Sequence, residues 1–420
     1  MSKNMKKSIL FPILLTACIF CSCESPINPN EEPLIRGGGI VDRVFNSQPI
    51  KLNVTPAEQS YSDVGADFAN NLFIKVCEQA KKDENVCLSP LSLEIALGML
   101  ANGVEPEAQK ELLSVIAGKN VTIDDMNAWY HKLRDAIEKT NNVKLANAIW
   151  AQKNYPIRQE FFKANQTYYD AEVGYLDFSR TQLAKDSICR WADLHTNGCI
   201  KDLNLPITPL TRMVLANATW LGALWANPFL EELTEKATFT TSSGKKQTVD
   251  MMFAPADTYG YGKTSSYEMI DIPFNHNSFS MLVALPRKGK TADDILSKIN
   301  WELPLENTDV ILRLPKFKFK TSNQLMDLMP ALGIKKLFKP NALSGINKEL
   351  EIGFINQDVS VSVYEAGTEM AAVTTIGMEA TSIQHPEPIS FLVDHSFVFC
   401  VRDNVCHNIL FIGKVEDIGK

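Results

Sequence analysis

The 420-residue sequence lacks the catalytic motifs by which hydrolases that act outside the cytoplasm are usually recognised. It contains no G-x-S-x-G turn, no H-E-x-x-H zinc motif and no S-x-x-K element paired with K-T-G. The tripeptide Gly262-Lys263-Thr264 ends like a phosphate-binding loop, but Asp257 stands where that loop needs a glycine. The six His residues are not spaced with Cys or acidic residues as metal ligands are. We therefore expect a protein that is not an enzyme and has neither a metal site nor a cofactor.

Positive charge is also scarce. The formal net charge is −7 at pH 7, which disfavours a polyanionic partner such as a nucleic acid. The one basic stretch, LPKFKFK, alternates Lys316, Lys318 and Lys320 with Phe317 and Phe319. Interleaved aromatic residues occur in nucleic-acid-binding proteins, but strict alternation is typical of a strand with one exposed and one buried face. We interpret the stretch as such a strand.

Apolar runs long enough to span a membrane are absent. The run near the start, Ile9 to Phe20, is too short and follows three Lys residues, a pattern typical of a secretory signal peptide. Two cysteines are then candidates for lipidation. Cys18 follows Leu15-Thr16-Ala17, the closer match to a bacterial lipobox, whereas Cys23 ends the fuller apolar stretch and leads into polar residues. Since cleavage at Cys18 would leave an apolar stub, we favour Cys23.

The expected location is extracytoplasmic. We predict a protein that is secreted by its signal peptide and lipid-anchored at the bacterial cell surface or outer membrane, with plain secretion as the alternative. Removing residues 1–22, which carry three Lys and no acidic residue, would take the formal net charge from −7 to −10. Residues 23–58 contain several Pro and the run Gly37-Gly38-Gly39, so we interpret them as a flexible tether.

Residues 59–420 are expected to form one large α+β domain, because no Gly/Pro-rich linker divides them and the chain is 45% apolar. Helical spacing of apolar residues predicts helices over about 61–80 and 89–100. Strand signals dominate later, and several segments, such as SFSMLVALP and SFVFCV, are apolar throughout, as strands covered on both faces are.

Of the nine cysteines, three (Cys18, Cys21 and Cys23) lie in or directly after the predicted signal peptide, and the other six lie in the predicted domain. Cys400 and Cys406 flank a predicted hairpin turn and could form a disulfide if the register allows. Buried thiols are the interpretation that we favour for all six.

The segment EAGTEMAAVTTIGMEATSIQHPEP, residues 365–388, has no Lys, no Arg and no helical pattern. Long structureless loops are uncommon in compact domains. Its small and β-branched residues suit a strand better than a flexible linker, so it is a strand without an evident partner.

The stretch VYEAGTEMAAVTT resembles the hinge of the serpin reactive-centre loop. Other blocks similar to serpin segments follow in order along the chain: NVCLSPLSLEIALGMLANGV, LANAIWAQKNYPIRQEFFKANQTYYDAEVGYLDFS, WADLHTNGCIKDL, LANATWLGALWANPF, LPKFKFKTSNQLMDLMPALGIKKLF, LVDHSFVFCVRD and ILFIGKVEDI. The resemblance covers about residues 60–418 and is specific, because many independent blocks agree in order.

This resemblance implies an α+β serpin fold with three β-sheets, about nine helices and an exposed reactive-centre loop. It implies a monomeric inhibitor of extracellular serine endopeptidases, with cysteine endopeptidases as a further class of target. A target protease would cut the loop and be trapped as an acyl-enzyme while the freed arm inserts as a new strand of a large sheet. A non-inhibitory serpin that acts as a binding protein or a cleavable protease substrate is the alternative.

The resemblance also assigns residues. The loop hinge would comprise Glu365, Gly367, Thr368, Glu369, Met370, Ala371 and Ala372, and Met370 departs from the small residue usual there. Counting from Gly367 places the reactive bond at Thr381-Ser382, with Met378, Glu379, Ala380 and Ile383 as nearby candidates. The polar latch of the sheet and the point where insertion begins would comprise Ser89, Ser92, Asn217, Gln357 and Trp225. Gln357 stands where the family has His, so the latch should not depend on pH.

The residues around the predicted reactive bond are small or apolar, which suits elastase- or subtilisin-like targets. A trypsin-like target is disfavoured, because the loop offers no Lys or Arg to its buried acidic pocket.

Overall fold

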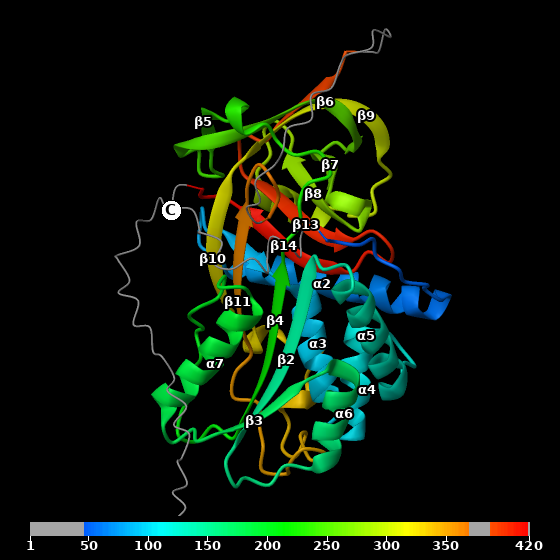
Figure 1. Cartoon of the computed structure of the whole chain (residues 1–420), viewed down its shortest axis with the longest axis vertical. Coiled ribbons are helices and arrows are strands. Elements are labelled where there is room, and N and C mark those ends of the chain that lie inside the picture. Colours follow the sequence, from blue (N-terminus) through cyan, green and yellow to red (C-terminus); the bar gives the residue numbers. More distant parts are fainter. Residues whose placement is uncertain (1–45, 369–386, 419–420) are drawn as a thin grey trace, which may run out of the picture. The chain divides into compact units, whose positions relative to one another are not determined.

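The computed structural model describes residues 46–368 and 387–418, which belong to one compact unit of the chain (Figure 1). Among these residues, no helix is both long and apolar enough to cross a membrane. The predicted signal peptide and both candidate lipidation sites, Cys18 and Cys23, lie outside the described residues.

The N-terminal half is mainly helical, as the apolar spacing predicted. Helix α2 begins with a capping box between Thr55 and Glu58, and α3 is buried on almost every side. Seven α-helices and several short 3-10 turns occur in the described part of the chain, somewhat fewer than the predicted nine. The α-helices are α2 (Pro56–Gln79), α3 (Pro90–Ala101), α4 (Pro106–Ile116), α5 (Ile123–Glu138), α6 (Gln159–Tyr169), α7 (Thr181–His195) and α8 (Ala292–Ile295).

The domain begins earlier than residue 59. Ile50, Leu52 and Val54 pack against the core, and the backbone N–H of Ile50 donates to the Ser278 hydroxyl at 2.9 Å. The last part of the predicted tether is therefore packed against the domain, because its apolar residues find a hydrophobic surface there.

The described residues form three sheets, as predicted. The largest has the order β1-β14-β13-β8-β7-β6-β9-β12, with β5 paired to β6. Every residue of β8, β13 and β14 is buried, in agreement with their apolar sequences. Its strands are β1 (Val86–Leu88), β5 (Glu235–Thr240), β6 (Lys246–Lys263), β7 (Tyr267–Pro273), β8 (Phe279–Pro286), β9 (Glu306–Pro315), β12 (Ile389–Leu392), β13 (Phe397–Asp403) and β14 (Ile409–Val415).

The other two sheets are small. One has the order β3-β2-β4, and the other consists of β10 and β11. Phe317 is buried and Lys318 and Lys320 are exposed, which confirms the predicted alternation in β10. These strands are β2 (Val143–Gln152), β3 (Glu172–Leu176), β4 (Met213–Leu221), β10 (Phe317–Gln324) and β11 (Asn356–Val363).

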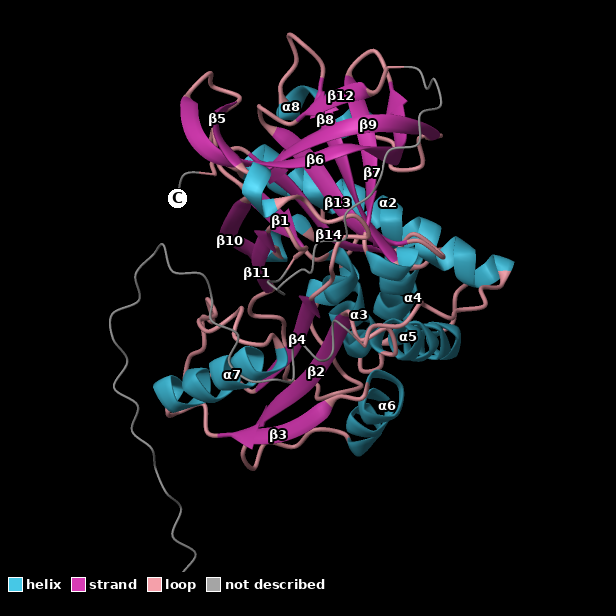
Figure 2. Cartoon of the chain, turned by 45° about the horizontal axis from the view of Figure 1, so that its top comes forward, coloured by secondary structure: helices cyan, strands magenta, loops and turns pink. Residues whose placement is uncertain are grey.

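Helices cover both faces of the β2–β4 sheet (Figure 2). Trp191 and Ala192 of α7 pack on even-numbered residues such as Ala218 of β4. Odd-numbered residues face the opposite side, where Ser92 of α3 bonds Asn217. The period of two along β4 thus assigns one set of side chains to α7 and the other to α3.

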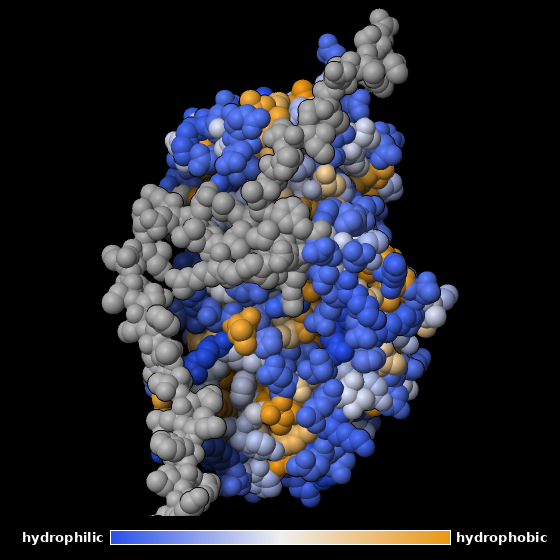
Figure 3. Space-filling view, in the orientation of Figure 1, coloured by the Kyte–Doolittle hydropathy of each residue, from blue (hydrophilic) through white to orange (hydrophobic). Residues whose placement is uncertain are grey.

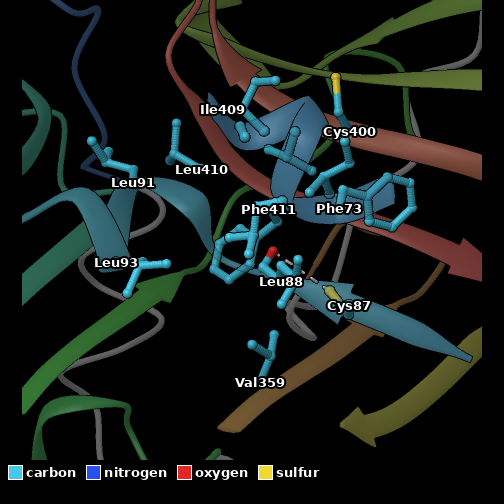
Figure 4. Close-up of a cluster of buried hydrophobic side chains, with 14 of the residues drawn as sticks. Phe73, Cys87, Leu88, Leu91, Leu93, Val359, Cys400, Ile409, Leu410 and Phe411 are labelled. Atoms are coloured by element: carbon cyan, nitrogen blue, oxygen red, sulfur yellow. Dashed lines mark hydrogen bonds between the residues drawn. The ribbon is translucent and has the colours of Figure 1, made fainter. Parts of the chain in front are cut away.

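The main core joins helices to all three sheets. Figure 4 shows side chains of α2, β1, α3, β11, β13 and β14 meeting in one cluster, including Phe73, Leu91, Val359 and Phe411. This cluster packs α3 against β14.

Cys400 and Cys406 are buried free thiols, so the structure contains no disulfide between them, and Cys77 and Cys87 are likewise buried and free. Burial raises the pKa of Cys87 and Cys400 far above the ordinary value and that of Cys77 to about 12. These thiols are therefore unreactive packing groups.

Candidate functional site

A cleft separates β4 from β11, which are neighbouring strands in Figures 1 and 2. Among the described residues, β4 pairs only with β2 and β11 only with β10, so no ladder joins the two facing edges. The cleft has a volume of about 750 Å³. Unpaired N–H and C=O groups along a strand edge favour the binding of a further strand.

The walls of the cleft are largely apolar. Leu93 and Leu97 of α3, Trp191 of α7, Val359 of β11 and Phe411 of β14 all line it. Figure 3 shows hydrophobic residues reaching the surface in the lower half of the view, where β2 and β4 run in Figure 1. Apolar side chains of an entering strand would be stabilised here by burial.

On the β4 side, the predicted latch residues form a chain of hydrogen bonds. The Ser92 hydroxyl donates to Asn217 Oδ1, and Asn217 Nδ2 donates to Asn147 Oδ1 at 2.6 Å. Asn147 Nδ2 in turn donates to the Tyr169 carbonyl at 2.8 Å. Asn217 is therefore held by both α3 and β2.

On the β11 side, Gln357 pairs with the backbone of Ser89. Its Oε1 accepts from the Ser89 N–H and its Nε2 donates to the Ser89 C=O, both at 2.8 Å. The Ser89 hydroxyl donates to the Leu410 carbonyl at 2.7 Å and makes no cap bond to α3. The amide uses one donor and one acceptor and carries no titratable proton.

The predicted latch thus forms two separate sets of hydrogen bonds. Ser92 with Asn217 holds the β4 edge, and Ser89 with Gln357 holds the β11 edge. Within the described residues, no hydrogen bond connects Gln357 to Asn217. The N-terminal turn of α3 connects the two sides of the cleft.

Trp225 lies against the start of the predicted hinge. It is 2% exposed, and its ring stacks on Phe274 with 4.5 Å between centroids. Its Nε1 donates to the Tyr364 carbonyl and its backbone N–H to the Ala366 carbonyl, each at 2.9 Å. Trp225 therefore binds both ends of the segment 364–366, one end through its side chain and the other through its backbone.

Glu365 is bound by two side chains that the sequence analysis did not assign to the site. Its Oε1 accepts from the Thr234 hydroxyl at 2.9 Å, and its Oε2 lies 3.2 Å from Lys316 Nζ. Lys316 also lies over the Tyr364 ring, 5.1 Å from its centroid. The alternation of Lys and Phe predicts only a strand at Lys316, and no local sequence signal indicates a partner 49 positions away.

Gly367 and Thr368 pair with the residues that follow β4. Leu224 and Gly367 form an antiparallel bridge, and the Thr368 N–H donates to the Ala223 carbonyl at 3.0 Å. A Cβ on Gly367 would lie 2.0 Å from that carbonyl oxygen, so only glycine fits. Thr368, the last described residue before the predicted loop, therefore lies beside the end of β4.

The other predicted loop residues lie outside the described residues. These are the hinge residues Glu369, Met370, Ala371 and Ala372, the predicted reactive bond Thr381-Ser382, and the nearby candidates Met378, Glu379, Ala380 and Ile383.

Comparisons with known proteins agree with this geometry. A family model described as Serpin (serine protease inhibitor) matches residues 63–418. An uncharacterized serpin-like protein of Methanosarcina mazei is 30% identical over 394 residues, which cover 88% of this chain and 91% of that protein. Glia-derived nexin of Rattus norvegicus is 30% identical over 388 residues, which cover 87% and 94%. The structure of human thyroxine-binding globulin complexed with thyroxine matches with a TM-score of 0.76 at 25% identity and covers 87% of this chain and all of that one.

Proposed function

Because the chain belongs to the serpin family, whose members are mostly protease inhibitors rather than catalysts, we propose that it inhibits extracellular serine endopeptidases as a suicide substrate. Cysteine endopeptidases are a further class of target. The protease serine attacks the carbonyl carbon of Thr381, the peptide bond to Ser382 breaks, and the new amine leaves with a proton. An ester then joins the protease to the arm.

The arm from Glu365 then inserts between β4 and β11 and carries the protease with it. The observation that supports this most is the antiparallel bridge at Leu224 and Gly367, placed beside a cleft with two unpaired edges. A strand that continues from Thr368 in this register runs antiparallel to β4. Residues 370–378 would then face residues 213–221 in reverse order, with 370 opposite 221 and 378 opposite 213.

This register predicts which side chains enter the core. Met370 would lie opposite Leu221, Ala372 opposite Thr219 and Thr374 opposite Asn217. Directly opposed residues of an antiparallel pair point to the same face, so these three would face α3. Met370 is larger than the residue usual in the family, and its bulk should slow insertion relative to simple cleavage.

Insertion is favoured by hydrogen bonding and burial. Each inserted residue gains about 0.5–1.5 kcal/mol from ladder bonds, and alternate side chains are buried as well. Summed over about a dozen residues, the gain is on the order of 10 kcal/mol. This exceeds the few kcal/mol that separate ordinary conformational states.

The proposed targets are elastase- or subtilisin-like enzymes, since the residue before the cut, Thr381, is small and β-branched, Met378, Ala380 and Ile383 lie near it in sequence, and residues 365–388 contain no Lys or Arg. The proposed place of action is the bacterial surface, to which a lipid on Cys23, or alternatively on Cys18, would anchor the protein. Mass analysis of the mature N-terminus tests the lipid and distinguishes the two cysteines.

A non-inhibitory binding role is the alternative, and thyroxine-binding globulin shows that this fold also serves a ligand-binding protein. Incubation with an elastase-like and a subtilisin-like enzyme separates the two functions. The inhibitor should give a covalent complex that survives a denaturing gel. Cleavage at the loop without such a complex, and without a rise in melting temperature, would favour the alternative.

A further inference from the structure

Residues 196–212, here called the crossing segment, connect α7 to β4 and are fastened to the opposite edge of the cleft. The Asn204 N–H donates to Asp358 Oδ2 at 3.1 Å, and Asn356 Nδ2 donates to the Asn204 C=O at 2.8 Å. Both Asn356 and Asp358 belong to β11. Two side chains of one cleft edge therefore bind the backbone of a segment that runs into the other edge.

The side-chain pattern of β11 explains this contact. Gln357 and Val359 point inward, to Ser89 and to the core respectively. Asn356 and Asp358 alternate with them and so point to the outer face, where the crossing segment lies.

Apolar contacts place the crossing segment across the cleft. Leu203 and Leu205 pack in a cluster with Ile188 of α7, Val214 of β4 and Phe354, which precedes β11. Leu203 and Leu205 also line the cleft. The segment therefore covers the outer side of the cleft between its two edges.

The geometry points to Asn356 and Asp358 as positioning residues that control the rate at which a strand enters the cleft. This inference rests on the proposed function, in which the arm inserts between β4 and β11. The side chains of a strand paired with β4 point alternately to the two faces of the sheet. Those opposite even-numbered β4 residues face α7, and on that side they must pass beneath the crossing segment. The bonds to Asn204 must open first, and the bond from its N–H to the Asp358 carboxylate is charge-assisted.

Uptake of a synthetic peptide tests this control without any protease. The probe is a fluorescently labelled peptide with the sequence of residues 368–379, added to the full-length intact protein, and the association rate is measured from fluorescence anisotropy. The double variant Asn356→Ala/Asp358→Ala should take up the peptide about tenfold faster than wild type, because the opening step loses a charge-assisted and a neutral hydrogen bond. Asp358→Asn keeps an acceptor without the charge and should be intermediate.

Ser362→Ala is the matched control. Ser362 lies on the same face of β11, and its side chain makes no hydrogen bond within the described residues. Its uptake rate should equal that of wild type. Melting temperatures measured in parallel distinguish faster opening from general loss of stability, since a partly unfolded variant would melt early without binding the peptide stoichiometrically.

The outcomes separate this inference from the proposed function. If wild type binds the peptide and the rates of the double variant and Asp358→Asn are unchanged or lower, the control by Asn356 and Asp358 is wrong while insertion stands. If neither wild type nor any variant binds the peptide, and cleavage of the loop leaves the melting temperature unchanged, insertion itself is wrong and both fall.

Discussion

Gly367 is the residue with the least freedom to change. Its φ is +157°, and any Cβ would overlap the Ala223 carbonyl oxygen. We expect Gly367→Ala to lower the free energy of unfolding by about 2 kcal/mol through displacement of the hinge backbone. Urea unfolding measures this. The control is Gly353→Ala, where nothing lies within 4 Å of the added Cβ; an equal effect of both substitutions would contradict the prediction.

Glu365 connects the hinge to Lys316, the residue between β9 and β10, through a partly buried ion pair. Its side chain is 13% exposed and that of Lys316 is 25% exposed. Glu365→Gln keeps the size but removes the charge, so we expect a loss of about 1 kcal/mol and faster proteolysis of the loop. Glu268→Gln is a suitable control, because its pair with Arg287 is longer, at 3.8 Å, and more exposed. Equal proteolysis of wild type and Glu365→Gln would argue against this anchor.

Glu94 is a buried carboxyl group whose protonation should make the free energy of unfolding depend on pH. It lies in α3, and a Cβ on Gly65 of α2 would be 2.9 Å from its Oε2. Burial raises the pKa of Glu94 to about 8, and the Tyr130 hydroxyl at 3.5 Å offsets this only in part. Since the folded-state pKa is above the ordinary 4.5, the protonated carboxyl favours the folded state. This contribution is complete below pH 4.5 and is lost as the pH rises through about 8.

We therefore expect the free energy of unfolding to fall between about pH 4.5 and about pH 8, by several kcal/mol at most. Glu94→Gln should flatten this slope, because the amide fits the same space without a titratable proton. Urea unfolding of both proteins at the two pH values gives the comparison. Parallel pH slopes would show that other groups dominate, such as the half-buried Asp271, whose pKa is raised by partial burial.

At the scale of elements, α3 joins the two edges of the cleft through its first turn. Gln357→Ala would leave the Ser89 N–H and C=O without their β11 partner. We expect the free energy of unfolding to fall by about 1–3 kcal/mol and peptide uptake to accelerate. Gln324→Ala, at the exposed end of β10, is the control and should change neither. Slower uptake by Gln357→Ala would mean that this bond does not restrain the β11 edge.

The sequence pattern predicted the position of an element where a strand is buried on both faces or a helix has a clear start signal. The apolar segments SFSMLVALP and SFVFCV supply β8 and most of β13, and the Ser-Pro signal marks the start of α3. The long strand β6 was not predicted from sequence. Its pairing with β9 shifts register between Ala254 and Asp257, and this irregularity disrupts the alternation by which a strand is recognised.

At the scale of the whole molecule, the described residues contain a cleft between two strands whose facing edges are unpaired, and the proposed function has the cleaved loop fill it. We expect cleavage of the loop to raise the melting temperature by roughly 10–15 °C, from a gain on the order of 10 kcal/mol spread over the unfolding entropy of a domain of this size. Calorimetry before and after nicking with a non-target protease measures the rise. An unchanged melting temperature, with the nicked chain still folded, would show that the arm does not insert.

The sequence by itself determined the buried faces of most strands, because burial alternates with a period of two along a strand. It also determined the order of motifs that carries the family resemblance, and that resemblance, not periodicity, singled out Ser89, Ser92, Asn217, Gln357 and Trp225. Only the tertiary structure decided that β4 and β11 stand apart, that Lys316 binds Glu365, and that Asn204 is fastened to Asp358. These contacts join residues 49 to 154 positions apart, and which edges and side chains meet depends on how the whole chain packs rather than on any local pattern.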